Sequence, residues 1–166
     1  MVVSGIAWKR TIFDYLSSGT EGRCMTSAKT SQYGYQDNTY RAVGGEAGVR
    51  QLVDSFYDLM SSKPEYQRIY RWHPDAEEAR EKLSRFLCGW MGGPRRYNEK
   101  YGPISIPKAH AHLAVTTVER DMWLNCMSEA LDAQEYPEAL KSYLLEQLGV
   151  PAEHIRRNSA SADNAH

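Results

Sequence analysis

The stretch GGEAGVRQLVDSFYDLM, residues 44–60, decides the fold class of this chain. Its apolar side chains recur at steps of three and four, which places them on one face of an α-helix. They are Val49, Leu52, Val53, Phe56 and Met60. Pro64 follows and predicts the end of this helix, because a proline inside a helix removes a backbone hydrogen bond. Such an apolar face needs other elements to cover it.

Three more long helices are predicted farther along the chain. The second follows Pro74 and has acidic residues in its first turn, and its inward stripe should consist of Ala79, Leu83, Phe86, Leu87 and Trp90. The third begins near Val118, with Thr117 or Thr116 as its cap. The last spans residues 137–148, and Gly149 and Pro151 are expected to stop it.

The connection GGPRRYNEKYGPISIPKAH, residues 92–110, carries several glycine and proline breaks. We expect an irregular loop there, with one short helical turn at most. No run alternates apolar and polar residues for long enough to make a strand, so the predicted fold is all-α. The domain proper is expected at residues 40–150, with an N-terminal extension at 1–39 and a C-terminal tail at 151–166. Residues 6–16 fit either a short amphipathic helix or a frayed terminus.

The charge balance and the cysteines narrow the class of protein. Twenty basic residues against 21 acidic ones, in a chain of 166, give a net charge of -1. The chain therefore has no large positive net charge that would attract nucleic acid or an anionic membrane surface. No apolar run approaches the roughly 20 residues that span a bilayer, and we expect no cleaved signal peptide. Cys24, Cys88 and Cys126 form no CxxC pair, so a reducing cytoplasm is the expected location.

The sequence lacks the signatures of the common nucleotide, zinc-protease and hydrolase sites. One histidine stands out instead, His110, at the junction between the irregular connection and the third long helix, with His112 two positions on. An isolated histidine in a helical protein is usually a surface or satisfied core residue. Its surroundings here change that expectation.

Three segments in a fixed order resemble the group II truncated haemoglobins: YRAVGGEAGVRQLVDSFYDLM at 40–60, EEAREKLSRFLCGWMGGPRRYNEKYG at 77–102, and HAHLAVTTVERDMWLNCM at 110–127. The combination of GGPRRY, a histidine sixteen residues after its proline, and a tryptophan within ERDMWLNCM is highly specific. The resemblance extends from about Tyr40 to Leu148. It implies a globin-like sandwich of two helices over two around haem b.

The resemblance also implies roles for individual residues. His110 would be the proximal iron ligand, while Tyr57 and Trp123 would lie on the distal side. A third distal polar residue would be His73, sixteen positions after Tyr57, with Tyr70 as the alternative. We expect these side chains to aim hydrogen-bond donors at a bound ligand.

The expected haem pocket is completed by Phe56, Ala79, Lys82, Leu83, Phe86, Tyr97 and Lys108. Among the basic residues, Lys82 and Lys108 are favoured over Arg95 as contacts of the haem propionates. The chain departs from the family pattern at Ala109 and His112, where arginine and proline are common, and in its long N-terminal extension. These departures bear on haem-edge contacts and partners.

Three functions are compatible with these residues. The first is a haem protein that binds oxygen, and also nitric oxide or CO, at a five-coordinate or weakly six-coordinate iron. The second is an enzyme at the same iron, a nitric oxide dioxygenase or a peroxidase-like protein, which needs an external reductase because nothing in this chain matches a flavin or nicotinamide site. The third is a haem-free interaction module. The chain is expected to be a monomer or a homodimer.

Overall fold

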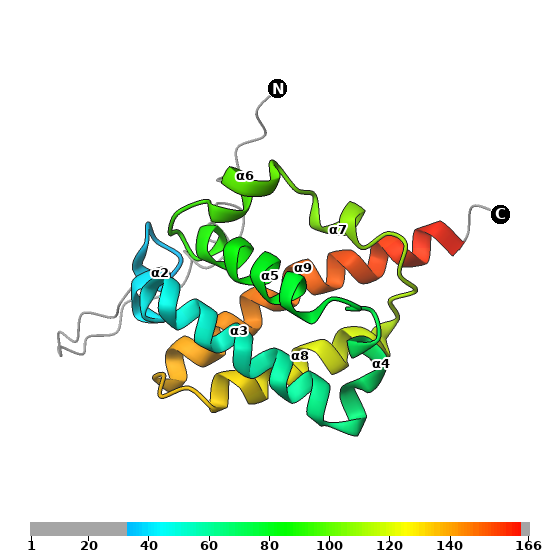
Figure 1. The fold of residues 1–166 in the computed structure, drawn as a ribbon, viewed down its shortest axis with the longest axis horizontal. Helices are drawn as coiled ribbons and strands as arrows, with labels where there is room; N and C mark the ends of the chain where they lie inside the picture. The colour runs from blue at the N-terminus through cyan, green and yellow to red at the C-terminus, as the bar shows by residue number, and fades with distance from the viewer. Residues whose placement is uncertain (1–32, 164–166) are drawn as a thin grey trace, which may run out of the picture.

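Two pairs of helices form the core of residues 33–163, the part of the chain that this computed structural model describes. One pair is α3 (Gly45–Ser62) with α5 (Ala76–Trp90), and the other is α8 (Thr117–Asp132) with α9 (Glu138–Asp163). The helices of each pair run in opposite directions, and α3 packs on α8 to join the pairs (Figure 1). Residues 33–163 contain no strand, which confirms the all-α prediction.

The predicted features of α3 are confirmed. Gly44 caps its start in the left-handed region, at φ 99°, a conformation that glycine adopts without strain. All five predicted stripe residues and Tyr57 are buried. The helix ends at Ser62, immediately before Lys63 and Pro64.

Helix α5 begins after Asp75, whose side chain accepts a hydrogen bond from the backbone N–H of Glu78 at 2.9 Å. The predicted inward stripe is confirmed. Leu87 is buried, together with Ser84 and Cys88, and the other four stripe residues are half-buried and pack against the core: Ala79, Leu83, Phe86 and Trp90. The apolar face of α5 is thus only partly covered by protein.

Short helices connect the long ones. They are α2 (Asn38–Ala42), a 3-10 turn (Pro64–Tyr66), α4 (Gln67–Tyr70), α6 (Arg96–Tyr101) and α7 (Ile106–Ala109). The connection at residues 92–110 therefore holds two short helices instead of the single turn expected, because Gly102 and Pro103 separate two segments that can each close a turn.

The two glycines of the GGPRRY motif allow a close approach of the chain to itself. A Cβ atom added at Gly92 would lie 1.9 Å from the carbonyl oxygen of Gln36, and one added at Gly93 would lie 2.6 Å from the ring of Tyr40. The backbone N–H of Tyr40 donates to the carbonyl of Met91 at 3.1 Å. The glycines thus let the residues around α2 pack against the end of α5.

Helix α8 starts at a capping box, in which Thr116 rather than Thr117 is the cap and Glu119 closes the box. The predicted end of α9 is wrong, since this helix continues through Gly149 and Pro151 to Asp163. Tertiary contacts outweigh the lost hydrogen bond at Pro151: α9 packs on α7, and Glu153 pairs with Arg120 of α8 at 2.6 Å. The short helix considered at residues 6–16 lies outside the described residues. No helix in the described part is long and apolar enough to cross a membrane.

Candidate functional site

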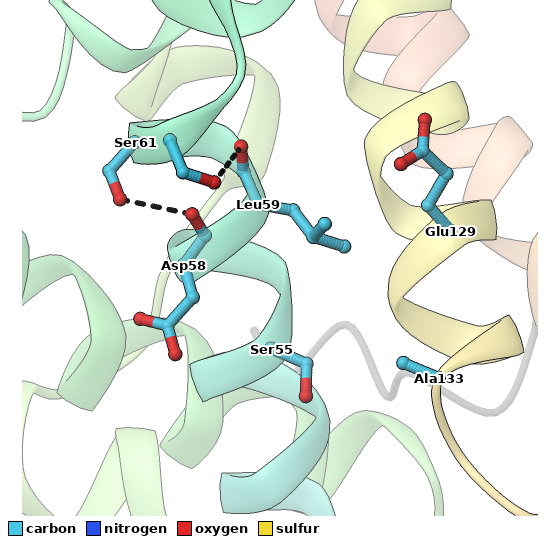
Figure 2. Close-up of a pocket in the computed structure, with 7 residues that line it drawn as sticks. Ser55, Asp58, Leu59, Ser61, Glu129 and Ala133 are labelled. Carbon is cyan, nitrogen blue, oxygen red and sulfur yellow. Dashed lines mark hydrogen bonds between the residues drawn. The ribbon is translucent and has the colours of Figure 1, made fainter.

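A hollow between α3 and α8 is one concave region of the surface, and Figure 2 shows its walls. Its lining consists of Ser55, Asp58, Leu59, Ser61, Ser62, Glu129 and Ala133. Two of its hydroxyls bond to carbonyls of their own helix, Ser61 to Asp58 at 3.1 Å and Ser62 to Leu59 at 3.4 Å. No residue singled out in the sequence lines this hollow, so the candidate site must be sought on other faces of α3 and α8.

His110 follows directly on α7 and is half-buried. Its Nδ1 atom lies 2.7 Å from the carbonyl oxygen of Ile106, four residues earlier. A carbonyl can only accept, so Nδ1 carries the proton and donates it. In the neutral ring, the lone pair therefore resides on Nε2. His112 is exposed, and the described residues give its ring no hydrogen bond, so the structure separates the two histidines.

Helix α9 supports the segment that carries His110. Asn158 donates its side-chain N–H to the carbonyl of Pro107 at 3.3 Å, and α7 packs along this part of α9. The continuation of α9 past Pro151 is what brings Asn158 to this place. Sequence reasoning missed this contact because it ended the helix at Leu148.

Tyr57 lies on α3 with only 3% of its surface exposed. Within residues 33–163 its hydroxyl has no hydrogen-bond partner, and burial raises the pKa of this phenol. Its ring meets Phe56 at 5.2 Å and His73 at 5.4 Å between centroids, both edge-on. A buried hydroxyl normally finds a partner, so this one is free for a group outside the protein chain.

His73 rather than Tyr70 packs its ring against Tyr57. The Nδ1 atom of His73 lies 3.0 Å from the carbonyl oxygen of Ile69, and its backbone N–H donates to the carbonyl of Tyr70 at 2.9 Å. Nδ1 again carries the proton, so the neutral ring presents a lone pair at Nε2. This differs from the donor that we expected from the sequence.

Trp123 lies on α8 and is half-buried, with its ring 5.2 Å from that of Phe56. Phe56 itself is completely buried and touches both Tyr57 and Trp123. In the described part of the chain, the indole N–H of Trp123 donates to no acceptor. Two side chains with unpaired donors, one from α3 and one from α8, therefore pack on the same phenylalanine.

Arg80 of α5 fixes the turn of α3 that carries Tyr57, a role that could not be predicted from the sequence. Its guanidinium donates to the carbonyl and carboxylate oxygens of Asp54 at 3.0 and 3.1 Å, and to the carboxylate of Asp58 at 2.6 Å. It also lies 5.6 Å from the centre of the Tyr57 ring. An ion pair between residues of two helices can be identified only when the packing of those helices is known.

An apolar strip on α5 is left partly uncovered by the protein. Ala79, Leu83 and Phe86 follow one another at steps of four and three and are all half-buried. The ring of Tyr97 on α6 extends this strip, 6.4 Å from that of Phe86. Because these side chains are only half-buried, part of this apolar surface is accessible to another apolar group.

The basic residues near this strip differ in how they are engaged. Lys82 pairs with Glu78 at 2.9 Å and lies 5.5 Å from the ring centre of Tyr101. Lys108 is exposed, and within residues 33–163 it has no ion pair. Arg95 is also exposed and caps α6. Lys108 and Arg95 are therefore free to meet an anion, whereas Lys82 would first have to leave Glu78.

Comparison with known proteins agrees with this arrangement. The family model of the bacterial-like globins matches residues 38–157. A curated relative, the group 2 truncated hemoglobin YjbI of Bacillus subtilis, is 30% identical over 126 residues, which are 76% of this chain and 93% of that protein. The helical bundle is similar to the group II 2-on-2 hemoglobin of Agrobacterium tumefaciens, with a TM-score of 0.68 and 32% identity over 80% of this chain and 98% of the other.

A truncated oxygen-avid haemoglobin from Bacillus subtilis gives a TM-score of 0.64 at 32% identity, covering 70% of this chain and 97% of its own. The family model spans most of the chain, and the relatives are matched over nearly their whole length. The chain belongs to the bacterial-like globins and, within them, to the group II truncated haemoglobins, a family whose members bind ligands at haem.

Proposed function

We propose that this protein binds haem b through His110 and uses it to bind dioxygen, with Tyr57 and Trp123 as donors to the bound ligand. The observation that carries the proposal is the hydrogen bond from His110 Nδ1 to the carbonyl of Ile106. Ligating histidines characteristically donate their second ring N–H to such an acceptor, which fixes the tautomer and directs Nε2 at the metal. His112 has no comparable support.

The residues present suit a flat apolar group that brings its own metal. The uncovered strip at Ala79, Leu83 and Phe86 offers apolar surface to such a group. Among the described residues, no three His, Cys, Asp or Glu side chains converge on a point that could hold a bare metal ion. One imidazole is enough, however, when a porphyrin supplies the other ligands. The sequence has no CxxCH motif for covalent attachment, so the expected form is haem b.

When bound, haem supplies an iron atom that coordinates a diatomic ligand. The chain supplies the rest: His110 holds the iron, and the hydroxyl of Tyr57 and the indole N–H of Trp123 stabilise negative charge that develops on the ligand. Such donors favour dioxygen over CO and slow its release. One structural relative is described as oxygen-avid, which supports assigning the same ligand here. Exposed Lys108 is the favoured contact for a haem propionate.

Absorption spectra of the His110→Gly variant test this function. The wild-type protein should show a Soret band after haem supplementation and form a stable complex with dioxygen. The variant should retain haem poorly, and added imidazole should restore its spectrum in part. The matched control is His112→Gly, which should behave as wild type. Wild-type-like ferrous and CO spectra in His110→Gly would refute the assignment of the proximal ligand.

A further inference from the structure

Two histidines of this protein are held in the same way. In His73 and in His110, Nδ1 bonds to the carbonyl oxygen of the residue four positions earlier, at 3.0 Å and 2.7 Å. A carbonyl oxygen cannot donate, so both rings carry their proton on Nδ1 and their lone pair on Nε2. The feature that qualifies His110 as a metal ligand is therefore repeated in His73.

His73 is fixed at three points. Besides its Nδ1 bond, its backbone N–H donates to the carbonyl of Tyr70 at 2.9 Å, and its ring meets Tyr57 edge-on at 5.4 Å. Burial lowers the pKa of this imidazole. The neutral form of His73 is thus favoured, and the neutral form is the one that ligates metals.

Among the described residues, none donates a hydrogen bond to the lone pair on Nε2 of His73. Within residues 33–163, neither Tyr57 nor Trp123 bonds to His73, although both carry donors in the same region. The terminal nitrogens of Arg80 donate to Asp54 and Asp58, and its Nε, which has no hydrogen-bond partner, does not bond to His73 either. Nε2 of His73 thus accepts no hydrogen bond from the described residues. Its lone pair is available to a Lewis acid such as a metal ion.

We propose that Nε2 of His73 coordinates the haem iron opposite His110 whenever no external ligand is bound. The inference rests on the haem binding proposed above and deepens it. One nitrogen–iron bond forms from the lone pair, and no proton or electron is transferred. An external ligand must then displace His73, so its capture is limited by the fraction of protein in which this bond is open. His73 would thus compete for the iron with the external ligand that Tyr57 and Trp123 stabilise.

The test is the spin and coordination state of the haem-loaded, full-length protein without external ligand. The wild type should show the absorption spectrum of six-coordinate, low-spin iron in the ferrous state under anaerobic conditions, and low-spin electron paramagnetic resonance in the ferric state. His73→Gln and His73→Phe should both give five-coordinate, high-spin ferrous iron. His112→Gln, which changes an exposed histidine, is the matched control and should stay low-spin.

Kinetics give a second readout with CO as the probe. In the wild type, the rate of CO binding should level off as the CO concentration rises, because opening of the His73 bond becomes limiting. In His73→Gln the rate should rise linearly, and apparent CO affinity should increase about tenfold if the open fraction of the wild type is about a tenth. Tyr70→Phe separates the two candidate residues and should leave both spectrum and kinetics unchanged.

The possible failures are distinguishable. A wild-type protein with full haem content and five-coordinate ferrous iron overturns the role of His73 and leaves the proposed function standing. A low-spin spectrum that persists in both His73 variants and is lost in Tyr70→Phe also overturns it. Protein that shows no Soret band after haem supplementation overturns the proposed function itself.

Discussion

Replacing Tyr57 by phenylalanine should stabilise the ligand-free protein and weaken its hold on dioxygen. The hydroxyl of Tyr57 is the atom concerned, because the residue is only 3% exposed and this group has no partner within residues 33–163. Phenylalanine keeps the ring, and with it the contacts to Phe56 and His73. The change therefore removes one unpaired polar atom from an otherwise preserved core.

The two effects have opposite signs and similar size. A buried hydroxyl without a partner costs about 1–3 kcal/mol, so its removal should raise the free energy of unfolding by about 1 kcal/mol, at the lower end of that range. With dioxygen bound, the same hydroxyl gains a hydrogen bond of about 1.4 kcal/mol, and losing it should speed dissociation about tenfold. Trp123 remains as a second donor, which keeps the effect from being larger.

Urea unfolding of the ligand-free ferrous holoprotein and stopped-flow dissociation of dioxygen measure the two effects. Tyr66→Phe is a matched control, since the hydroxyl of Tyr66 donates to the carboxylate of Glu129 at 2.7 Å. A bond to a charged acceptor contributes about 1.5–3 kcal/mol, and the half-exposed position of Glu129 reduces this. The control variant should therefore be destabilised and release dioxygen at the wild-type rate.

The reasoning is refuted if Tyr57→Phe lowers the stability of the ligand-free protein as Tyr66→Phe does, since the hydroxyl would then have a partner within the fold. It is also refuted if dioxygen dissociation stays at the wild-type rate. In that case the phenol does not face the ligand.

Two further predictions concern stability. Burial acts to raise the pKa of Glu119, but hydrogen bonds from Thr116 and the charge of Arg68 outweigh it and hold this pKa below its ordinary value. The contribution of Glu119 to stability is therefore complete above the ordinary pKa and is lost as pH falls through the lowered one. Glu119→Gln should lower the free energy of unfolding by about 1–3 kcal/mol at pH 7. Urea titrations should show that the difference from wild type shrinks towards acid pH. Deletion of residues 1–38 should lower the thermal midpoint by several degrees relative to deletion of residues 1–32, because it also removes Tyr33, whose ring lies 5.5 Å from that of Tyr143 on α9. Equal midpoints for the two deletions would contradict this.

The helices whose apolar spacing is regular could be predicted from the sequence. The stripe of α3 needed only the steps between Val49 and Met60, since a helix buried against other helices shows its period directly. The N-cap of α8 could also be predicted from the sequence. Glu119 stands three residues after Thr116, the spacing of a capping box, and this selects Thr116 over Thr117.

The errors have a common physical origin in long-range contacts. Pro151 stops an isolated helix, but the packing of α9 on α7 and the ion pair of Glu153 with Arg120 carry the helix past it. On α5, the predicted inward stripe does pack against the core, and yet Leu83 and Phe86 remain partly uncovered. A sequence pattern predicts that one face of a helix is apolar. It does not predict whether that face is covered by protein or by an apolar ligand.

The polar atoms around Tyr57 that the fold leaves unpaired argue that this region serves binding as well as stability. Many polar side chains of the described core are satisfied: Gln134 donates to Ser55 and to a backbone carbonyl, and the hydroxyl of Ser84 donates to the carbonyl of Arg80. The hydroxyl of Tyr57 and the indole N–H of Trp123 have no such partner within residues 33–163, and both rings pack on Phe56. The buried Nε of Arg80 also lacks a hydrogen bond, and its guanidinium lies 5.6 Å from the ring centre of Tyr57. A second buried atom without a hydrogen bond, Oε1 of Glu119, lies in an ion pair with Arg68 instead. A donor that the fold leaves unpaired lowers its stability and is available to a bound ligand, so the donors around Tyr57 support a binding role for this region.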